Sequence, residues 1–140
     1  MQFSIHYPPF AKKTLIALTN NERARLLVAE DRNVEEIEVI ESPETETSGR
    51  TRGADANIDQ DYDAMKEHRL SHLYGSLSER MRYLLDHEGY ASAVICVPEA
   101  NKNTFASAMH PDILKRIEDV VPKNLCSMDI NNVVRILIDG

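Results

Sequence analysis

Six residues about two thirds of the way along the chain, Ser92–Val97, read Ser-Ala-Val-Ile-Cys-Val, carry no charge and are followed by Pro98. A short apolar run with β-branched residues and a proline stop is typical of a strand covered on both faces. This run also follows the longest helical pattern in the sequence. We therefore expect Ser92–Val97 to be the central strand of a sheet, with the other elements beside it or over it.

Three further strands are predicted before this run, and two tight turns separate them. The strands are expected at Lys13–Thr19, Arg23–Glu30 and Val34–Glu41. The turns are predicted at Asn20-Asn21 and Asp31-Arg32-Asn33, because asparagine tolerates positive φ. In the third strand a period of two puts Ile37 and Val39 on one face and Glu36 and Glu38 on the other. Acidic residues along a strand suit an exposed sheet edge.

Helical patterns account for most of the remaining chain. A long helix is predicted at Tyr62–Glu88, with one apolar stripe at three- and four-residue steps and a stop at Gly89. Gly75 in its middle suggests close packing or a bend. Two short helices, a short strand and a last helix capped by Ser127 follow, at Asn101–Met109, Pro111–Ile117, Asp119–Pro122 and about 128–139. The order is a β-meander and then crossovers that extend the sheet in parallel.

The organisation expected is an N-terminal arm at residues 1–11 and one α/β domain at 12–140, with a long loop at 42–61. A net charge of −7 argues against a protein that coats duplex nucleic acid. The chain shows no signal-peptide pattern and no apolar run near ~20 residues, so membrane insertion and export are not expected. Cys96 and Cys126 lack metal-binding or disulfide spacing and are expected to be free thiols in the cytoplasm.

Four segments together resemble a family of bacterial proteins required for attachment to host cells. They are Ile16–Leu27, Val94-Ile-Cys-Val-Pro98, Met109–Ile117 and Val121-Pro-Lys-Asn-Leu-Cys126. The ordered set spans about residues 13–139. Glu99-Ala100-Asn101 departs from that family, which has a proline-and-arginine run there.

The host-attachment family is in turn similar to the middle domain of archaeal and eukaryotic release factors and of Pelota. That resemblance implies a ribonuclease-H-like mixed sheet, with an antiparallel meander followed by αβαβα. In release factors the loop before the long helix carries Gly-Gly-Gln, whereas this chain has Ser48-Gly-Arg-Thr-Arg-Gly-Ala54. Peptidyl-tRNA hydrolysis is therefore not implied. Metal-dependent nuclease chemistry is disfavoured as well, because Lys13–Thr19 and Ser92–Val97 contain no carboxylate.

Arginines in the loop are the candidate binding residues. Gly49, Arg50, Arg52 and Gly53 could contact phosphates, because arginine forks fit them and glycine lets the backbone approach closely. Arg69 on the long helix is a further candidate binding residue. Arg80 and Arg82 on the same helix are expected to extend the phosphate-binding surface. The alternative is a solvated loop with incidental arginines.

Two weaker candidates concern chemistry at metals and thiols. His68 and His72 lie four residues apart on the helix and could hold zinc with Asp61 or Asp63, or could be two partly exposed histidines beside the apolar stripe. Cys126 could be a nucleophile with His110 as its base, whereas Cys96 is expected to be inert packing. We expect no cofactor.

The sequence therefore favours a non-enzymatic adaptor that binds RNA or a translation complex, such as the ribosome, through residues 48–57 and the start of the long helix. The alternative is a protein-interaction module in surface attachment or envelope regulation that uses the acidic edge strand or the arm. Either of those two segments would also be the surface for a homo-oligomer. A metal-dependent hydrolase is the least favoured class.

Overall fold

The computed structural model describes residues 10–41 and 58–139, with the side chains of 58–67 and 139 left aside. Its elements are three strands, β1 (Phe10–Thr19), β2 (Arg23–Asp31) and β3 (Asn33–Glu41), then the long helix α2 (Ile58–His87), β4 (Ser92–Cys96), a 3₁₀ turn η1 (Glu99–Asn101), α3 (Lys102–Ala108), α4 (Pro111–Arg116), β5 (Ile117–Val121) and α5 (Ile130–Asp139). The expected arm and loop fall on residues 1–9 and 42–57, outside the described part. β1 takes in the last two residues assigned to the arm, and α2 the last four assigned to the loop.

The five strands form one mixed sheet in the order β3-β2-β1-β4-β5. β1, β2 and β3 are antiparallel neighbours, while β4 pairs in parallel with both β1 and β5. This confirms the predicted ribonuclease-H-like α/β fold. The central strand, however, is β1, and β4 lies beside it, because the parallel crossover through α2 returns the chain to the free side of β1.

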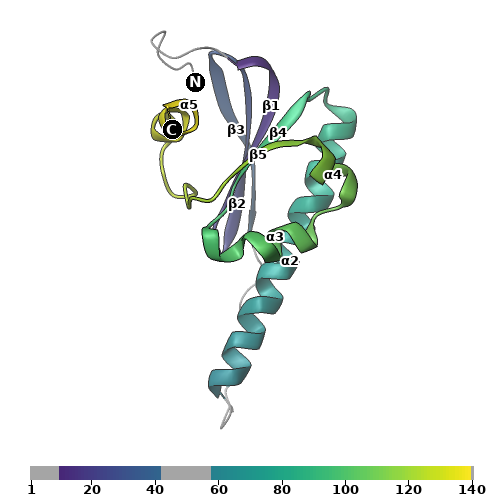
Figure 1. Cartoon of the computed structure of the whole chain (residues 1–140), viewed down its shortest axis with the longest axis vertical. Helices are drawn as coiled ribbons and strands as arrows, with labels where there is room; N and C mark the ends of the chain where they lie inside the picture. The colour runs from purple at the N-terminus through teal and green to yellow at the C-terminus, as the bar shows by residue number, and fades with distance from the viewer. Residues whose placement is uncertain (1–9, 42–57, 140) are drawn as a thin grey trace.

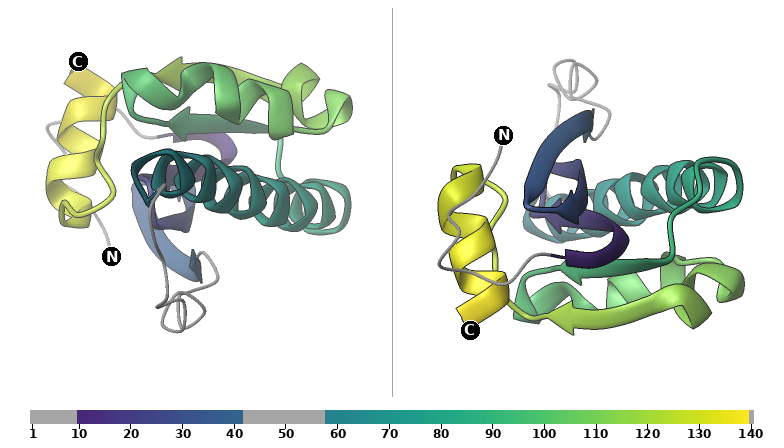
Figure 2. Two further views of the ribbon diagram at one scale, coloured as in Figure 1. Left: turned by 90° about the horizontal axis from the view of Figure 1, so that it is seen from below. Right: turned by 90° about the horizontal axis from the view of Figure 1, so that it is seen from above.

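Helices cover both faces of the sheet (Figures 1 and 2). One face packs against α2, α3 and α4, in a cluster that includes Leu15, Ala17, Leu73, Leu77 and Phe105. The other face packs against α5, in a cluster that includes Ile16, Leu18, Val133 and Val134. Successive residues of a strand point to opposite faces. The apolar run Leu15–Leu18 is therefore fully buried and joins both clusters.

A bulge in β3 changes which face of the sheet its side chains lie on, compared with the prediction from strict alternation. Leu26 pairs with Glu38 and Leu27 with Glu36, so Ile37 is an extra residue opposite β2. Because an extra residue reverses the sense of the alternation, Glu36 lies on the face of α5 and Glu38 on the face of α2. The prediction that the two glutamates share one face was therefore wrong.

Two boundaries in the second half also differ from the prediction. β5 begins at Ile117, which was assigned to the preceding helix, because Ile117 is extended, pairs with Ala93 and packs on the core. α5 is capped by Asp129 in place of Ser127: the Asp129 Oδ1 atom accepts a hydrogen bond of 2.9 Å from the backbone N–H of Asn132. An N-cap carboxylate satisfies one of the free N–H groups of the first turn.

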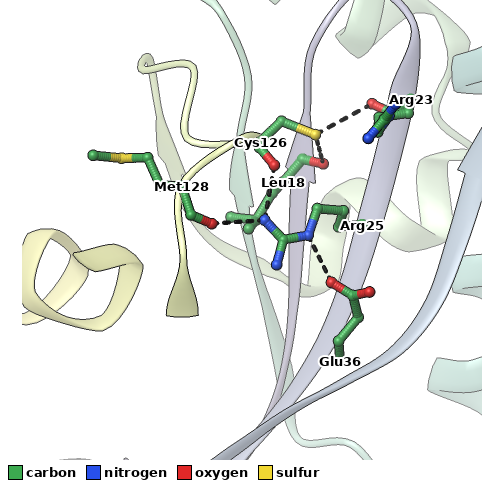
Figure 3. A network of polar contacts seen from close by, with 6 residues as sticks. All are labelled: Leu18, Arg23, Arg25, Glu36, Cys126 and Met128. Carbon is green, nitrogen blue, oxygen red and sulfur yellow. Dashed lines mark hydrogen bonds and ion pairs between the residues drawn. The ribbon is translucent and has the colours of Figure 1, made fainter. Parts of the chain in front are cut away.

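Arg25 on β2 ties the segment before α5 to the sheet (Figure 3). Its Nη1 atom donates to the carbonyl oxygens of Cys126 and Met128, both at 2.8 Å, and its Nε donates to Glu36 at 2.6 Å. The Cys126 thiol lies 3.4 Å from the Leu18 carbonyl oxygen, which it can use as an acceptor. Only 15% of the Arg25 side chain is exposed. These contacts fix how α5 lies over its face of the sheet.

We predict that Arg25→Ala lowers the free energy of unfolding by about 2–3 kcal/mol, because two partly buried carbonyls and a carboxylate lose their donor. Arg23→Ala is the matched control: it changes an exposed arginine on the same strand and should cost less than about 0.5 kcal/mol. Urea denaturation followed by circular dichroism measures both. Equal losses in the two variants would show that the guanidinium does not anchor α5.

Candidate functional site

The carboxyl ends of β1 and β4 lie side by side, because Leu18 pairs with Cys96 in a parallel ladder. In open α/β sheets, ligands bind beside the carboxyl ends of the strands. β3 runs in the same direction as β1 and leads into residues 42–57, and α2 begins after them. The start of α2 runs beyond this end of the sheet (Figure 1). The strand ends and the start of α2 therefore belong to the same end of the molecule.

A polar network occupies these strand ends. The Thr19 hydroxyl donates to the Cys96 carbonyl oxygen at 3.1 Å and lies 3.4 Å from the Tyr74 hydroxyl of α2. The Asn101 side-chain amide donates to Tyr74 at 3.4 Å and to the Asn21 side-chain oxygen at 2.7 Å. We call Thr19, Asn21, Tyr74 and Asn101 the strand-end network. It joins α2, η1 and the β1–β2 turn.

The side chains of the strand-end network are all neutral. Burial raises the pKa of the Tyr74 hydroxyl, so the group stays protonated at neutral pH. Two-metal nuclease chemistry needs carboxylates on such strands, and this network supplies hydroxyls and amides. Sequence reasoning found the Asn20-Asn21 turn but missed the network, because Tyr74 matches the apolar stripe of α2 and gives no separate signal.

A shallow groove of about 480 Å³ lies between α2 and α3, next to the network. Its lining consists of small and neutral residues: Ser71, Gly75, Asn103, Thr104, Ser107 and Ala108. A Cβ atom added at Gly75 would meet no heavy atom within 4 Å. The glycine therefore widens this groove, and the prediction that it permits close packing was wrong.

The structure places three of the predicted site residues on α2, near the end that runs beyond the sheet. His68 and His72 are exposed and Arg69 is half-buried. At 100° per residue, His68 lies on the same side of the helix as Gly75, seven residues on, and hence toward the groove. Arg69 lies on the same side as Arg80, toward β3. The other predicted residues, Gly49, Arg50, Arg52 and Gly53, lie outside the described part of the chain.

Among the described residues, no third side chain lies where it could bind zinc together with His68 and His72. Nowhere in the part of the chain that the structure describes do three histidine, cysteine, aspartate or glutamate side chains gather in a way that could hold a metal ion. Asp61 and Asp63 lie in the first turns of α2, where the structure describes the backbone alone.

Arg80 and Arg82, which are predicted to extend the binding surface, each lie beside a carboxylate of this chain. Arg80 Nε lies 2.6 Å from Glu38 of β3, and its guanidinium stacks over the Tyr83 ring at 5.1 Å. Arg82 lies 4.0 Å from Asp112 of α4. Because β3 and α4 pack beside the second half of α2, both arginines face carboxylates of this chain.

The two cysteines are buried, and the structure does not join Cys126 to His110. The thiol of Cys126 contacts backbone carbonyls of the sheet in the cluster under α5. The backbone N–H of His110 donates to Ser78 on the opposite, α2-covered face, while its ring accepts from Asp112. Burial raises the pKa of the Cys126 thiol and raises that of Cys96 to about 12. Neither thiol is placed as a nucleophile.

No family model and no curated protein matches the sequence. Among solved structures, the fold is that of a release-factor-like α/β protein. A similar structure is that of Dom34 from Saccharomyces cerevisiae, described as a translation termination-like factor involved in RNA quality control pathways and interacting with Hbs1.

The likeness to Dom34 has a TM-score of 0.50 and 9% sequence identity, and it covers 91% of this chain and 33% of that one. This chain therefore spans about a third of the length of that protein. The likeness establishes the fold. The resemblance to host-attachment proteins remains a prediction.

We predict that neither cysteine reacts with a thiol reagent at pH 8 while the chain is folded, and that both react in urea. The pKa of Cys96 rises from 9.0 to about 12 on burial, so its proton is retained as pH rises between these values. Because the folded state holds this proton more tightly than the unfolded state does, stability should fall as pH rises through that window. The absorbance of the thiolate that an aromatic disulfide reagent releases measures the reaction. A fast native-state reaction at pH 8 would contradict the buried placement.

Tyr74→Phe tests the strand-end network. It should lower the free energy of unfolding by about 1 kcal/mol, because Thr19 and Asn101 lose a buried hydroxyl partner. Tyr83→Phe is the control, since 48% of Tyr83 is exposed, and it should change stability by less than about 0.5 kcal/mol. Thermal unfolding of both variants gives the comparison, and an unchanged Tyr74→Phe would remove the network as a link between α2 and the strand ends.

Proposed function

We propose that the chain is a non-enzymatic adaptor that binds RNA within a translation complex. The proposed contact surface is residues 48–57 together with the start of α2. The observation that carries the proposal is the projection of α2 beyond the carboxyl ends of the strands, within a release-factor-like fold (Figure 1). The resemblance to host-attachment proteins is consistent with the same fold. It suggests a role in attachment but no molecular mechanism.

Charge limits the form that RNA binding can take. The chain has a net charge of −7, so contacts with phosphate must be local. Arg50, Arg52 and Arg69 are the cations near the start of α2 that the proposal uses. Neutralising about three phosphates of a single strand gives a salt slope near −2, or roughly a 15-fold loss of affinity from 50 to 200 mM salt.

The groups around the strand ends favour binding over catalysis. The Thr19 and Tyr74 hydroxyls of the strand-end network are fully buried, while Asn21 is exposed and Asn101 half-buried. The two amides can therefore meet polar groups of a ligand, and they do not ionise at neutral pH. The groove between α2 and α3 has a neutral lining. Such surfaces suit contacts to sugar hydroxyls and base edges, while the arginines contact phosphates.

We expect the chain to comigrate with a ribosomal subunit in a sucrose gradient at low salt, and this comigration should weaken at moderate salt. Replacing Arg50, Arg52 and Arg69 with alanine should lower the bound fraction at least about tenfold, because three phosphate contacts are lost. Arg135→Ala and Lys115→Ala are controls that each remove one positive charge. Both change exposed side chains, on α5 and α4, away from the start of α2 (Figure 1).

A chain that stays at the top of the gradient at every salt concentration would refute the proposal. If each control variant loses as much affinity per removed charge as the triple variant does, the location of the surface is refuted, because binding would then follow overall charge.

A protein-interaction module in surface attachment or envelope regulation is the second candidate. It is favoured by Ile37 and Val39 on β3, each 42% exposed on an edge strand. Recovery of envelope or signalling proteins by the wild-type chain, with no ribosomal component and with loss of capture in Val39→Lys, would support this function. Recovery of ribosomal components alone would support the first.

A further inference from the structure

The part of α2 before Leu70 runs beyond the carboxyl ends of the strands (Figure 1). Leu70 is the first described side chain of the helix that is buried, whereas His68 is exposed and Arg69 half-buried. We call residues 58–69 of α2 the projecting segment. At 1.5 Å per residue it is about 18 Å long, so a tilt of about 10° at its base would move its first turn by about 3 Å.

Apolar side chains hold the rest of α2 on the sheet, among them Leu70, Leu73 and Leu77. The hydrophobic effect is non-directional, so these contacts restrict small rotations of the helix only weakly. Hydrogen bonds have preferred distances and angles and restrict such rotations more strongly. The angle of the projecting segment therefore depends on the polar contacts that α2 makes near its base.

The Tyr74 hydroxyl makes the polar contact that is nearest to the projecting segment among the side chains of α2 that the structure describes. It lies 3.4 Å from the Thr19 hydroxyl and accepts a hydrogen bond of 3.4 Å from the Asn101 amide. Asn101 also donates to Asn21 at 2.7 Å. The hydroxyl thus joins the base of the projecting segment to β1, to η1 and to the β1–β2 turn.

A second buried hydroxyl anchors α2 one turn further along. Ser78 is 6% exposed, and its Oγ atom accepts a hydrogen bond of 2.9 Å from the backbone N–H of His110, just before α4. Tyr74 and Ser78 are four residues apart and therefore lie on one side of the helix. Both hydroxyls tie α2 to its neighbours, but only that of Tyr74 ties it to the strand ends.

We propose that Tyr74 is a positioning residue of the RNA-binding surface, and that Asn101 acts through it. The Tyr74 hydroxyl sets the angle between the projecting segment and the carboxyl ends of the strands, so that the start of α2 meets RNA in one orientation. Binding sites rely on supporting hydrogen bonds of this kind, because a displacement of about 1 Å weakens several contacts at once. The inference rests on the proposed function, since it concerns the surface proposed there.

The angle is measured first, without RNA. Nitroxide labels at Glu22→Cys and Glu67→Cys report the distance from the β1–β2 turn to the projecting segment in pulsed electron double resonance. The native thiols stay unlabelled because both are buried. The otherwise unchanged chain should give one narrow distance distribution. Tyr74→Phe and Asn101→Ala should broaden or shift it, whereas Ser78→Ala should leave it unchanged.

RNA affinity is then measured by fluorescence anisotropy with a labelled oligouridine. Tyr74→Phe should weaken binding at least about threefold. It removes only the hydroxyl and keeps the ring, whose centroid lies 5.3 Å from that of Phe105 in an edge-on contact. None of Tyr74 is exposed, so the loss cannot come from a direct contact with RNA.

Ser78→Ala is the matched control for Tyr74→Phe. It also removes one buried hydroxyl from α2, so it should lower the stability by a similar amount while leaving the RNA affinity within about twofold. Equal losses of affinity in the two variants would overturn the proposal, because affinity would then follow stability. An unchanged distance distribution in Tyr74→Phe would overturn it too.

A changed distribution with unchanged affinity would also overturn the proposal, because the angle would then not matter for binding. Failure of the proposed function gives a different result. The wild-type chain would then bind neither the oligouridine nor a ribosomal subunit, which removes the RNA-binding role, while the distance measurement still decides whether Tyr74 positions the projecting segment.

Discussion

The parallel pairing of β1 with β4 is the constraint on which the rest of the structure depends. Thr14–Leu18 pair with Ser92–Cys96, more than seventy residues later in the chain. Both strands are apolar and buried on both faces, so the pairing satisfies their backbone groups while removing their side chains from water. The crossover that it requires must carry the chain over one face, and α2 does so. The pairing also sets the two strand carboxyl ends side by side, and the strand-end network and the start of α2 are placed by that geometry.

The two faces of the sheet are stabilised in different ways. Three helices cover one face, with Leu73, Leu77 and Phe105 in its core. The short helix α5 covers the other, and Arg25 holds the segment before it through two carbonyls (Figure 3). An arginine with five fixed donors can bridge a strand, a loop and an edge carboxylate at once. One residue thus couples the position of α5 to β3.

Much of the fold could be predicted from the sequence, and the errors have physical causes. Pro98, Gly89 and the asparagine turn marked strand, helix and turn boundaries, because these residues restrict or extend φ locally. The bulge at Ile37 and the helix-to-strand change at Ile117 depend on pairing with distant strands, which local patterns do not carry. For the site, sequence placed candidate arginines on one long helix but could not show that Arg80 and Arg82 face carboxylates of β3 and α4. It also missed Tyr74, whose hydroxyl contacts became evident only in the folded chain. The arginines at residues 50 and 52 remain predictions.

Neutral groups at the strand ends, buried thiols and a projecting helix support the proposed recognition role. Hydrogen–deuterium exchange of the full chain, with and without purified ribosomal subunits, tests this account most directly. It predicts that subunits slow exchange at the start of α2, through His68–His72, and leave α4 and β5 unchanged. Slowing confined to β3, or no change at any amide, would contradict an RNA-binding role for this end of the molecule.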